Sequence, residues 1–224
     1  LHPTAPHLRI GSRFSIRRRY DALTTPAASM LDVEGLELSP VVDLPDVVHV
    51  HDFTTPPCSN GQCEAEFSIG KYDEERRGMY DSELFAGNRF IHVGIDIGAP
   101  VGTPVRSFAD GVVYSYGVNS AVGDYGPTII TKHHFNGVDV WALYGHLSSS
   151  SLDGLVIGNA VRAGQRMAWL GEERENGGWP PHLHFQLSLQ EPEGYDLPGV
   201  VSPSERAKAL KTFPDPRIVL GQLY

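Results

Sequence analysis

Glycine and proline recur so often along this chain that they limit the length of any regular element. The 224 residues include 24 glycines and 17 prolines. Both residues interrupt helices, and proline also removes a backbone donor from the interior of a sheet. Between them lie short runs rich in β-branched and aromatic residues, which are typical of strands. The pattern predicts a mainly β fold of short strands, either an antiparallel β-sheet sandwich or a partly open barrel.

These strand signals concentrate between residues 87 and 190. An Asn136-Gly137 pair separates two of them and predicts a β-hairpin. We therefore divide the chain into an irregular N-terminal segment (1–86), a β domain (87–190) and a C-terminal tail (191–224) in which one short helix is expected over residues 203–211. The predicted strands cover residues 92–98, 111–116, 128–132, 138–144, 166–170 and 182–189.

Charge and hydropathy argue against two classes of partner. The chain has 27 acidic and 18 basic residues, a formal net charge of -9. This balance disfavours nucleic acid, whose phosphates require clustered Lys and Arg. The basic cluster at residues 17–19 is interpreted as a solvated turn or arm. No apolar run approaches the ~20 residues of a membrane span.

The missing initiator Met and secretory signal suggest a processed form or a piece of a longer protein, so localisation stays open.

Two alternating runs place polar side chains on one face of a strand. In residues 92–98, Val93, Ile95 and Ile97 are apolar, whereas His92 and Asp96 project to the other side. The glycine between them, at position 94, leaves that side open. In residues 182–189 one face is apolar and the other carries His182, His184, Gln186 and Ser188. Each apolar face should pack on the core, and each polar face should look into a cleft.

Histidine and aspartate in these two runs are the donors that a catalytic zinc site requires. Zinc binds imidazole nitrogen and carboxylate oxygen, and catalytic sites use three protein ligands and a water. One His and one Asp from the first run and one His from the second would supply them. His146, in Tyr144-Gly145-His146-Leu147, and the remaining histidine are then free for proton transfer. Each pair alone is more often structural, but their recurrence in one strand-rich region favours a site.

Four motifs in the same order resemble the lysostaphin (LytM-type) zinc metallopeptidases. They are residues 94–113 (beginning Gly94-Ile95-Asp96), Tyr144-Gly145-His146-Leu147-Ser148, the turn at residues 158–165, and Pro181-His182-Leu183-His184-Phe185. The resemblance covers about residues 87–190. It implies an antiparallel β fold with a groove over one zinc ion per chain, bound by His92, Asp96 and His184.

The resemblance also implies a metalloendopeptidase activity on peptides, commonly those of bacterial cell-wall cross-bridges. Zinc would lower the pKa of its bound water toward ~7, and that water would attack the peptide bond. His146 and His182 would flank this water as the catalytic pair. One would transfer the proton and the other would hold the developing oxyanion, in an order that the sequence leaves open.

The segment at residues 172–181 departs from the family pattern. It is charged and carries two prolines where the family has a small, Gly-Ser-Thr-rich turn, and it should border the groove, which argues against a glycine-rich substrate. With the tail at residues 198–217 it resembles a subgroup in which the peptidase-like module is joined to a sugar-kinase-like part and a class III aminotransferase. The other domains of such a chain would be partners, in a cytoplasmic setting.

Two other functions remain as alternatives: a non-hydrolytic zinc-binding module that regulates or recruits a partner, and a β-barrel that binds a small molecule without metal. The run His49-Val50-His51-Asp52 is interpreted as a strand rather than a second metal site. Cys58 and Cys63 are either a disulfide or free thiols. Cys58 or Asn60 is a candidate inhibitory plug over the zinc.

Overall fold

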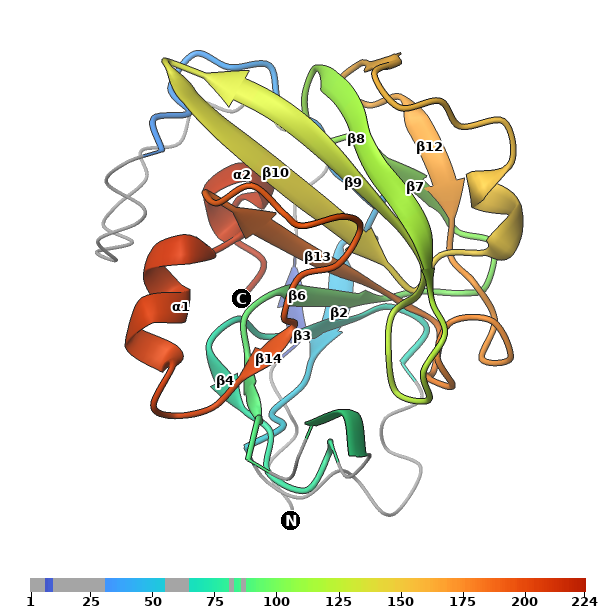
Figure 1. Ribbon diagram of the computed structural model, residues 1–224. Coiled ribbons are helices and arrows are strands. Elements are labelled where there is room, and N and C mark those ends of the chain that lie inside the picture. The colour runs from blue at the N-terminus through green and yellow to red at the C-terminus, as the bar shows by residue number, and fades with distance from the viewer. Residues whose placement is uncertain (1–6, 10–30, 55–64, 81–82, 86–87) are drawn as a thin grey trace.

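The computed structural model describes residues 7–9, 31–54, 65–80, 83–85 and 88–224 (Figure 1). A nine-stranded open sheet forms the centre of the molecule, in the order β1-β2-β3-β6-β13-β10-β9-β8-β11. Its strands are β1 (His7–Arg9), β2 (Val47–Val50), β3 (Ser68–Gly70), β6 (Ile95–Gly98), β8 (Gly111–Asn119), β9 (Gly126–Phe135), β10 (Val138–Gly145), β11 (Ala160–Val161) and β13 (His182–Ser188). All neighbours pair antiparallel except β2 and β3, which are parallel.

Two smaller sheets and four short helices complete the described elements. One sheet pairs β7 (Pro104–Arg106) with β12 (Arg166–Trp169), and the other has the order β14-β5-β4. The remaining bounds are β4 (Glu74–Glu75), β5 (Ile91–His92), β14 (Val200–Val201), the 3-10 turns η1 (Glu83–Phe85) and η2 (Ser149–Leu152), and the helices α1 (Arg206–Thr212) and α2 (Arg217–Leu220). The predicted mainly β class with a short C-terminal helix is confirmed.

Two long strands, β9 and β10, meet at the predicted hairpin. Phe135 faces Val138 across a two-residue turn. Asn136 and Gly137 both have positive φ, 47° and 86°, which matches the type I′ turn that an Asn-Gly pair favours. This hairpin sets the register of β10, whose other edge pairs with β13.

The site strands β6 and β13 lie next to each other because both have an apolar face. Ile95 and Ile97 on β6 and Leu183 and Phe185 on β13 are 0–2% exposed and belong to one core cluster. At 25 cal/mol per Å² of apolar surface, each such side chain contributes about 2 kcal/mol by burial. The alternation then turns the polar residues of both strands to the opposite face, and Asp96 is paired directly with His184.

The single strand predicted for residues 92–98 is wrong in one respect. The chain leaves the sheet pattern at Val93-Gly94, so that β5 joins the small β14-β5-β4 sheet and β6 joins the large one. Gly94 permits this path. A Cβ at this position would lie only 2.5 Å from Cε1 of His184, closer than real Cβ contacts allow.

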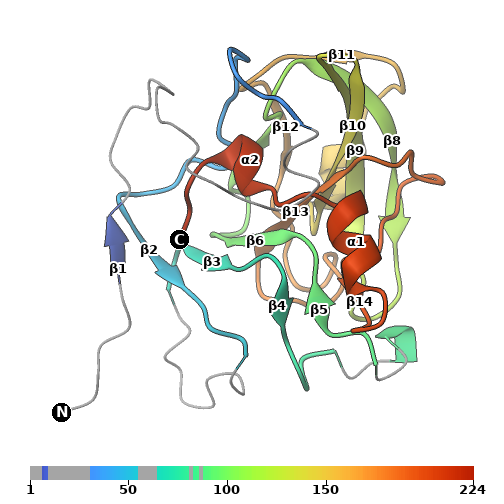
Figure 2. The ribbon, with the colours of Figure 1, turned by 90° about the vertical axis from the view of Figure 1, so that its left-hand side faces the viewer.

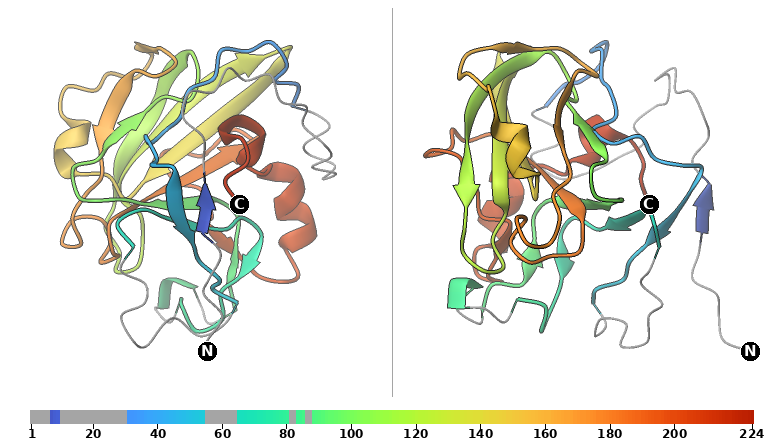
Figure 3. Two further views of the ribbon diagram at one scale, coloured as in Figure 1. Left: turned by 180° about the vertical axis from the view of Figure 1, so that it is seen from behind. Right: turned by 90° about the vertical axis from the view of Figure 1, so that its right-hand side faces the viewer.

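Segments from both ends of the chain pack beside these strands. Before β5, β3 pairs with β6 and β4 with β5. After β13, β14 pairs with the other edge of β5. The tail also reaches the N-terminal segment, since the hydroxyl of Tyr72 donates to the carbonyl of Phe213 at 2.7 Å. Figures 2 and 3 show β1–β3 on one side of the molecule and β8–β11 on the other, with β6 and β13 between them.

The C-terminal helix begins three residues later than predicted and is followed by a second, α2, which the sequence reading did not anticipate. The described residues contain no helix of the length and apolarity that a bilayer crossing requires.

Candidate metal centre

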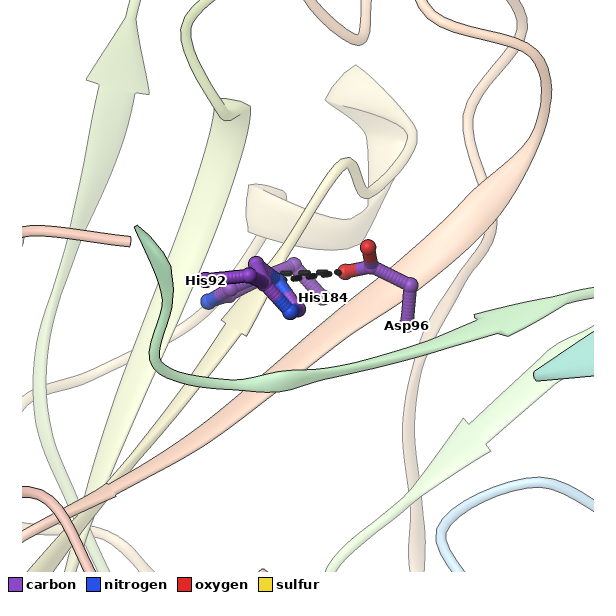
Figure 4. Close-up of side chains that lie close together, drawn as sticks. All are labelled: His92, Asp96 and His184. Atoms are coloured by element: carbon purple, nitrogen blue, oxygen red, sulfur yellow. Dashed lines mark hydrogen bonds and ion pairs between the residues drawn. The ribbon is translucent and has the colours of Figure 1, made fainter. Parts of the chain in front are cut away.

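His92, Asp96 and His184 come from three different strands, β5, β6 and β13, and turn their side chains to one point (Figure 4). His92 Nε2 lies 3.1 Å from His184 Nδ1 and 3.2 Å from Asp96 Oδ1. His184 Nδ1 lies 3.0 Å from the same carboxylate oxygen. Within the described residues these three form the one set of His, Cys, Asp or Glu side chains close enough to share a metal ion.

This triangle of atoms fits zinc. Ligands at ~2.0–2.2 Å from a tetrahedral ion are about 3.3–3.5 Å apart, close to the 3.0–3.2 Å measured here. Two imidazoles and one carboxylate are also a donor set that zinc prefers. The fourth tetrahedral position is left to a water or a substrate oxygen.

The second nitrogen of each histidine has a partner that fixes the tautomer. His92 Nδ1 lies 3.0 Å from the carbonyl oxygen of Lys71, and His184 Nε2 lies 3.0 Å from Gln186 Oε1. Both partners are acceptors, so each histidine donates outward and turns an unprotonated nitrogen toward the other two ligands. Three lone-pair acceptors at these separations repel one another unless a cation lies among them.

The protonation of the three groups also suits a cation. Burial lowers the pKa of His92 to about 4. Burial acts to raise the pKa of Asp96, but the charge of Arg76, which donates to Asp96 Oδ2, outweighs it, and this pKa lies well below its usual range. At neutral pH the site therefore holds an ionised carboxylate and a neutral His92, the forms in which both residues bind metal.

His146 and His182 lie beside this set. Their rings are 4.2 Å apart between centroids, and His182 Nε2 is 3.8 Å from Asp96 Oδ1. His146 Nδ1 lies 2.7 Å from the carbonyl oxygen of Asn176, and His182 Nδ1 lies 2.7 Å from that of Pro180. Each therefore donates from Nδ1 and keeps Nε2 as a proton acceptor.

Burial also keeps both of these imidazoles neutral. It lowers the pKa of His146 well below its usual value, with the charge of His182 acting in the same direction, and it lowers the pKa of His182. A neutral imidazole with an open Nε2 is the form that accepts a proton. His146 occupies the left-handed region with φ 62°, which a non-glycine residue adopts only where its surroundings hold it.

Residues 90–194 match Peptidase family M23. The chain resembles this family over that segment, which is 105 of its 224 residues. Its predicted resemblance to the lysostaphin type is thereby confirmed.

Two relatives that match part of the M23 segment are bacterial peptidases. The DD-carboxypeptidase/endopeptidase Mpg of Neisseria meningitidis serogroup B is 42% identical over 99 residues, 44% of this chain and 20% of the relative. The glycyl-glycine endopeptidase ALE-1 of Staphylococcus capitis is 34% identical over 110 residues, 49% of this chain and 27% of the relative. This chain therefore spans about a quarter or less of the length of these two relatives.

A solved structure is similar over a larger share of the chain. The catalytic domain of lysostaphin from Staphylococcus simulans is 26% identical, with a TM-score of 0.41, and the match covers 63% of this chain and 92% of that domain. The predicted fusion to a sugar-kinase-like part and an aminotransferase finds no support in these relatives.

A groove of about 710 Å³ runs over His92, Asp96 and His184. One side is formed by Trp179, Pro180 and Pro181, so the segment at residues 172–181 borders the groove, as its sequence predicts. The N-terminal segment forms another part of the wall, with His51, Phe53, Arg76 and Tyr80. The groove is thus built from more of the chain than the M23 segment.

Sequence reasoning missed four residues of this site. Asn176 and Gln186 orient histidines, Tyr125 places its hydroxyl 3.5 Å from His184 Nε2, and Arg76 binds Asp96. Alternation already placed Gln186 on the polar face of residues 182–189, but its contact with His184 was not predicted. Arg76 lies in the run Glu74-Glu75-Arg76-Arg77, which looks like solvated surface.

Other predicted features lie apart from the metal set or outside the described residues. His49 and His51 do not belong to the group that could hold a metal, in agreement with their interpretation as strand residues, although His51 lines the groove. The basic cluster at residues 17–19, both cysteines and the proposed plug at Cys58 or Asn60 lie outside the residues that the structure describes.

Proposed function

We propose that this chain is a zinc-dependent metallopeptidase with one zinc ion per chain, bound by His92, Asp96 and His184, and that residues 87–190 are its catalytic domain. The observation that carries the proposal is the set of three ligand atoms 3.0–3.2 Å apart, with two further neutral imidazoles beside it in a groove. When bound, zinc supplies a Lewis acid that lowers the pKa of a water and polarises a carbonyl.

His146 and His182 then act as the proton-transferring pair. One accepts a proton at Nε2 as a water oxygen attacks the peptide carbonyl carbon. The imidazolium returns this proton to the amine nitrogen when the C–N bond breaks, leaving an amine and a carboxylic acid, and the acid then releases its remaining proton to solvent. The other can stabilise the oxyanion only when it carries a proton on Nε2, because its Nδ1–H already donates to a backbone carbonyl.

The proposed substrates are cell-wall-type peptides cleaved at an internal bond. The names of the two relatives support this class, since one is a DD-carboxypeptidase/endopeptidase and the other a glycyl-glycine endopeptidase. The groove wall favours residues with side chains over polyglycine. Tyr80 lies 4.9 Å from Phe85 and 6.0 Å from Trp179 between ring centroids, and these three rings offer apolar contact that glycine cannot use.

The test combines metal content with cleavage of synthetic peptides. We expect about one zinc per chain, release of new amino termini from D-Ala-containing peptides, slower cleavage of pentaglycine, and loss of cleavage in His182→Ala with zinc retained. His134→Ala is the matched control, because His134 is an exposed histidine paired with Asp139 on the same sheet. Full zinc occupancy without cleavage of any peptide would contradict the proposal and favour a non-hydrolytic zinc-binding module.

A further inference from the structure

Asp96 divides its two oxygens between two different neighbours. Oδ1 faces the histidines, 3.0 Å from His184 Nδ1 and 3.2 Å from His92 Nε2. Oδ2 accepts a hydrogen bond from Arg76 Nη1 at 2.5 Å. Oδ1 is therefore the oxygen that faces the point between the histidines, and Oδ2 is turned to Arg76.

Arg76 itself is held on every side. Its side chain is 2% exposed, and a buried guanidinium is tolerated only when its charge and its donors are paired. Nε bonds Glu74 Oε2 at 3.1 Å, Nη1 also reaches the hydroxyl of Tyr80 at 3.2 Å, and Nη2 donates to the carbonyl of Lys71 at 3.3 Å. The ring of Phe53 covers it, with its centroid 4.8 Å from Cζ.

Glu74 is the counter-charge that fixes this arginine. It is 4% exposed, and its other oxygen, Oε1, accepts the backbone N–H of Phe53 at 3.1 Å and lies 3.3 Å from Lys71 Nζ. Glu74 therefore cannot follow Arg76 if the guanidinium moves. The pair resists displacement of Arg76 toward the groove.

The strands place this pair against the metal ligands. Glu74 on β4 lies opposite His92 on β5, and Gly70 on β3 lies opposite Asp96 on β6. A Cβ at position 70 would lie 2.7 Å from Arg76 Nη2 and 3.2 Å from Asp96 Cβ, so the absence of a side chain there makes room for the Arg76–Asp96 contact. All of these supporting residues precede the M23 segment, which begins at residue 90.

We infer that Arg76, anchored by Glu74, is a positioning residue that restricts Asp96 to binding the metal through one oxygen. This inference rests on the proposed zinc site. A carboxylate free to bind through both oxygens would take up a coordination position that water or substrate requires. The N-terminal segment is in this sense part of the metal centre.

Cobalt(II) substitution tests the inference independently of peptide cleavage, because four-coordinate cobalt absorbs visible light more strongly than five- or six-coordinate cobalt. In Arg76→Met we expect the visible absorption of the bound cobalt to fall about twofold or more as Asp96 adds its second oxygen. Arg77→Met is the matched control, because the neighbouring Arg77 is exposed and its described side-chain contacts are with Glu75 and the ring of Phe90, not with Asp96. Its spectrum should equal that of the unchanged protein.

A spectrum of Arg76→Met that coincides with that of the unchanged protein overturns the inference. If Arg76→Met does not fold, Gly70→Ala decides, since it displaces the guanidinium without removing its charge: a weaker spectrum supports the inference and an unaltered spectrum overturns it. Failure of the unchanged protein to bind zinc or cobalt would instead refute the proposed metal site, so the two failures are distinguishable.

Discussion

Two buried histidine environments in this protein differ in how their nitrogens are used. His133 on β9 is 1% exposed, and burial lowers its pKa to about 4, the same value as for His92. Its Nδ1 lies 2.9 Å from the carbonyl of Asp110 and its Nε2 lies 2.6 Å from Thr131 Oγ1, so both nitrogens are satisfied locally. The ring of Phe108 is 4.3 Å away.

The site histidines instead use one nitrogen for a local partner and direct the other to a shared point. Burial and a depressed pKa are therefore common to a structural histidine and to a candidate ligand, and neither property identifies the site. What separates them is the convergence of unsatisfied lone pairs with a carboxylate.

The largest expected effect is loss of zinc on removing a converging group. His184→Ala or Asp96→Asn should reduce bound zinc from about one ion per chain to nearly none, because two ligands do not hold the ion against dilution. His133→Gln should keep the full amount. Elemental analysis after gel filtration measures this, and zinc lost from His133→Gln as readily as from His184→Ala would break the comparison.

A second effect should separate the metal ligands from the other two imidazoles. His146→Ala and His182→Ala should each retain zinc and lose about 10²–10⁴-fold in kcat, the usual contribution of a positioned acid or base. Steady-state kinetics with a chromogenic peptide, alongside zinc analysis of the same samples, measures both quantities. Loss of zinc in either variant would make that residue a ligand rather than a proton carrier.

The sequence predicts the three candidate metal ligands better than the residues and strand pairings that hold them in place. Alternation along residues 92–98 and 182–189 assigns His92, Asp96 and His184 to polar faces, and the structure brings these side chains together. The break at Val93-Gly94 was missed because alternation continues through it, whereas the choice between two sheets depends on which strands lie alongside. Arg76 was missed because a charged run in a sequence looks the same whether its side chains are solvated or form buried ion pairs. Only the pairing of β3 with β6 and of β4 with β5 shows that Arg76 is buried.

A third, smaller effect on zinc affinity is expected at Gly94, where the absence of a side chain leaves room for the His184 ring. Gly94→Ala would put a Cβ 2.5 Å from the His184 ring, which is buried and cannot retreat. We expect about 10–100-fold weaker zinc binding, the usual cost of disturbing a ligand's orientation.

Gly117→Ala is the control for Gly94→Ala, since its Cβ would meet the ring of Tyr195, which is 39% exposed and free to turn. Competition with a zinc-binding dye measures both affinities. Equal affinities in the two variants would mean that the position of the His184 ring does not depend on Gly94.

The smallest expected effect is that of His133 on the free energy of unfolding, which should be absent at neutral pH and develop as the pH is lowered. The pKa of His133 is about 4 in the folded chain and 6.5 unfolded, so the unfolded state binds more protons between these values. Keeping His133 neutral in the folded state therefore costs no stability above pH 6.5. As the pH falls toward 4 it lowers the free energy of unfolding progressively, by about 3 kcal/mol in total.

His133→Gln has no proton to gain there, so its free energy of unfolding should fall less steeply with acid than that of the unchanged protein. Urea unfolding of the metal-free proteins at several pH values measures the two slopes. Equal slopes would mean that His133 does not share the low pKa of His92.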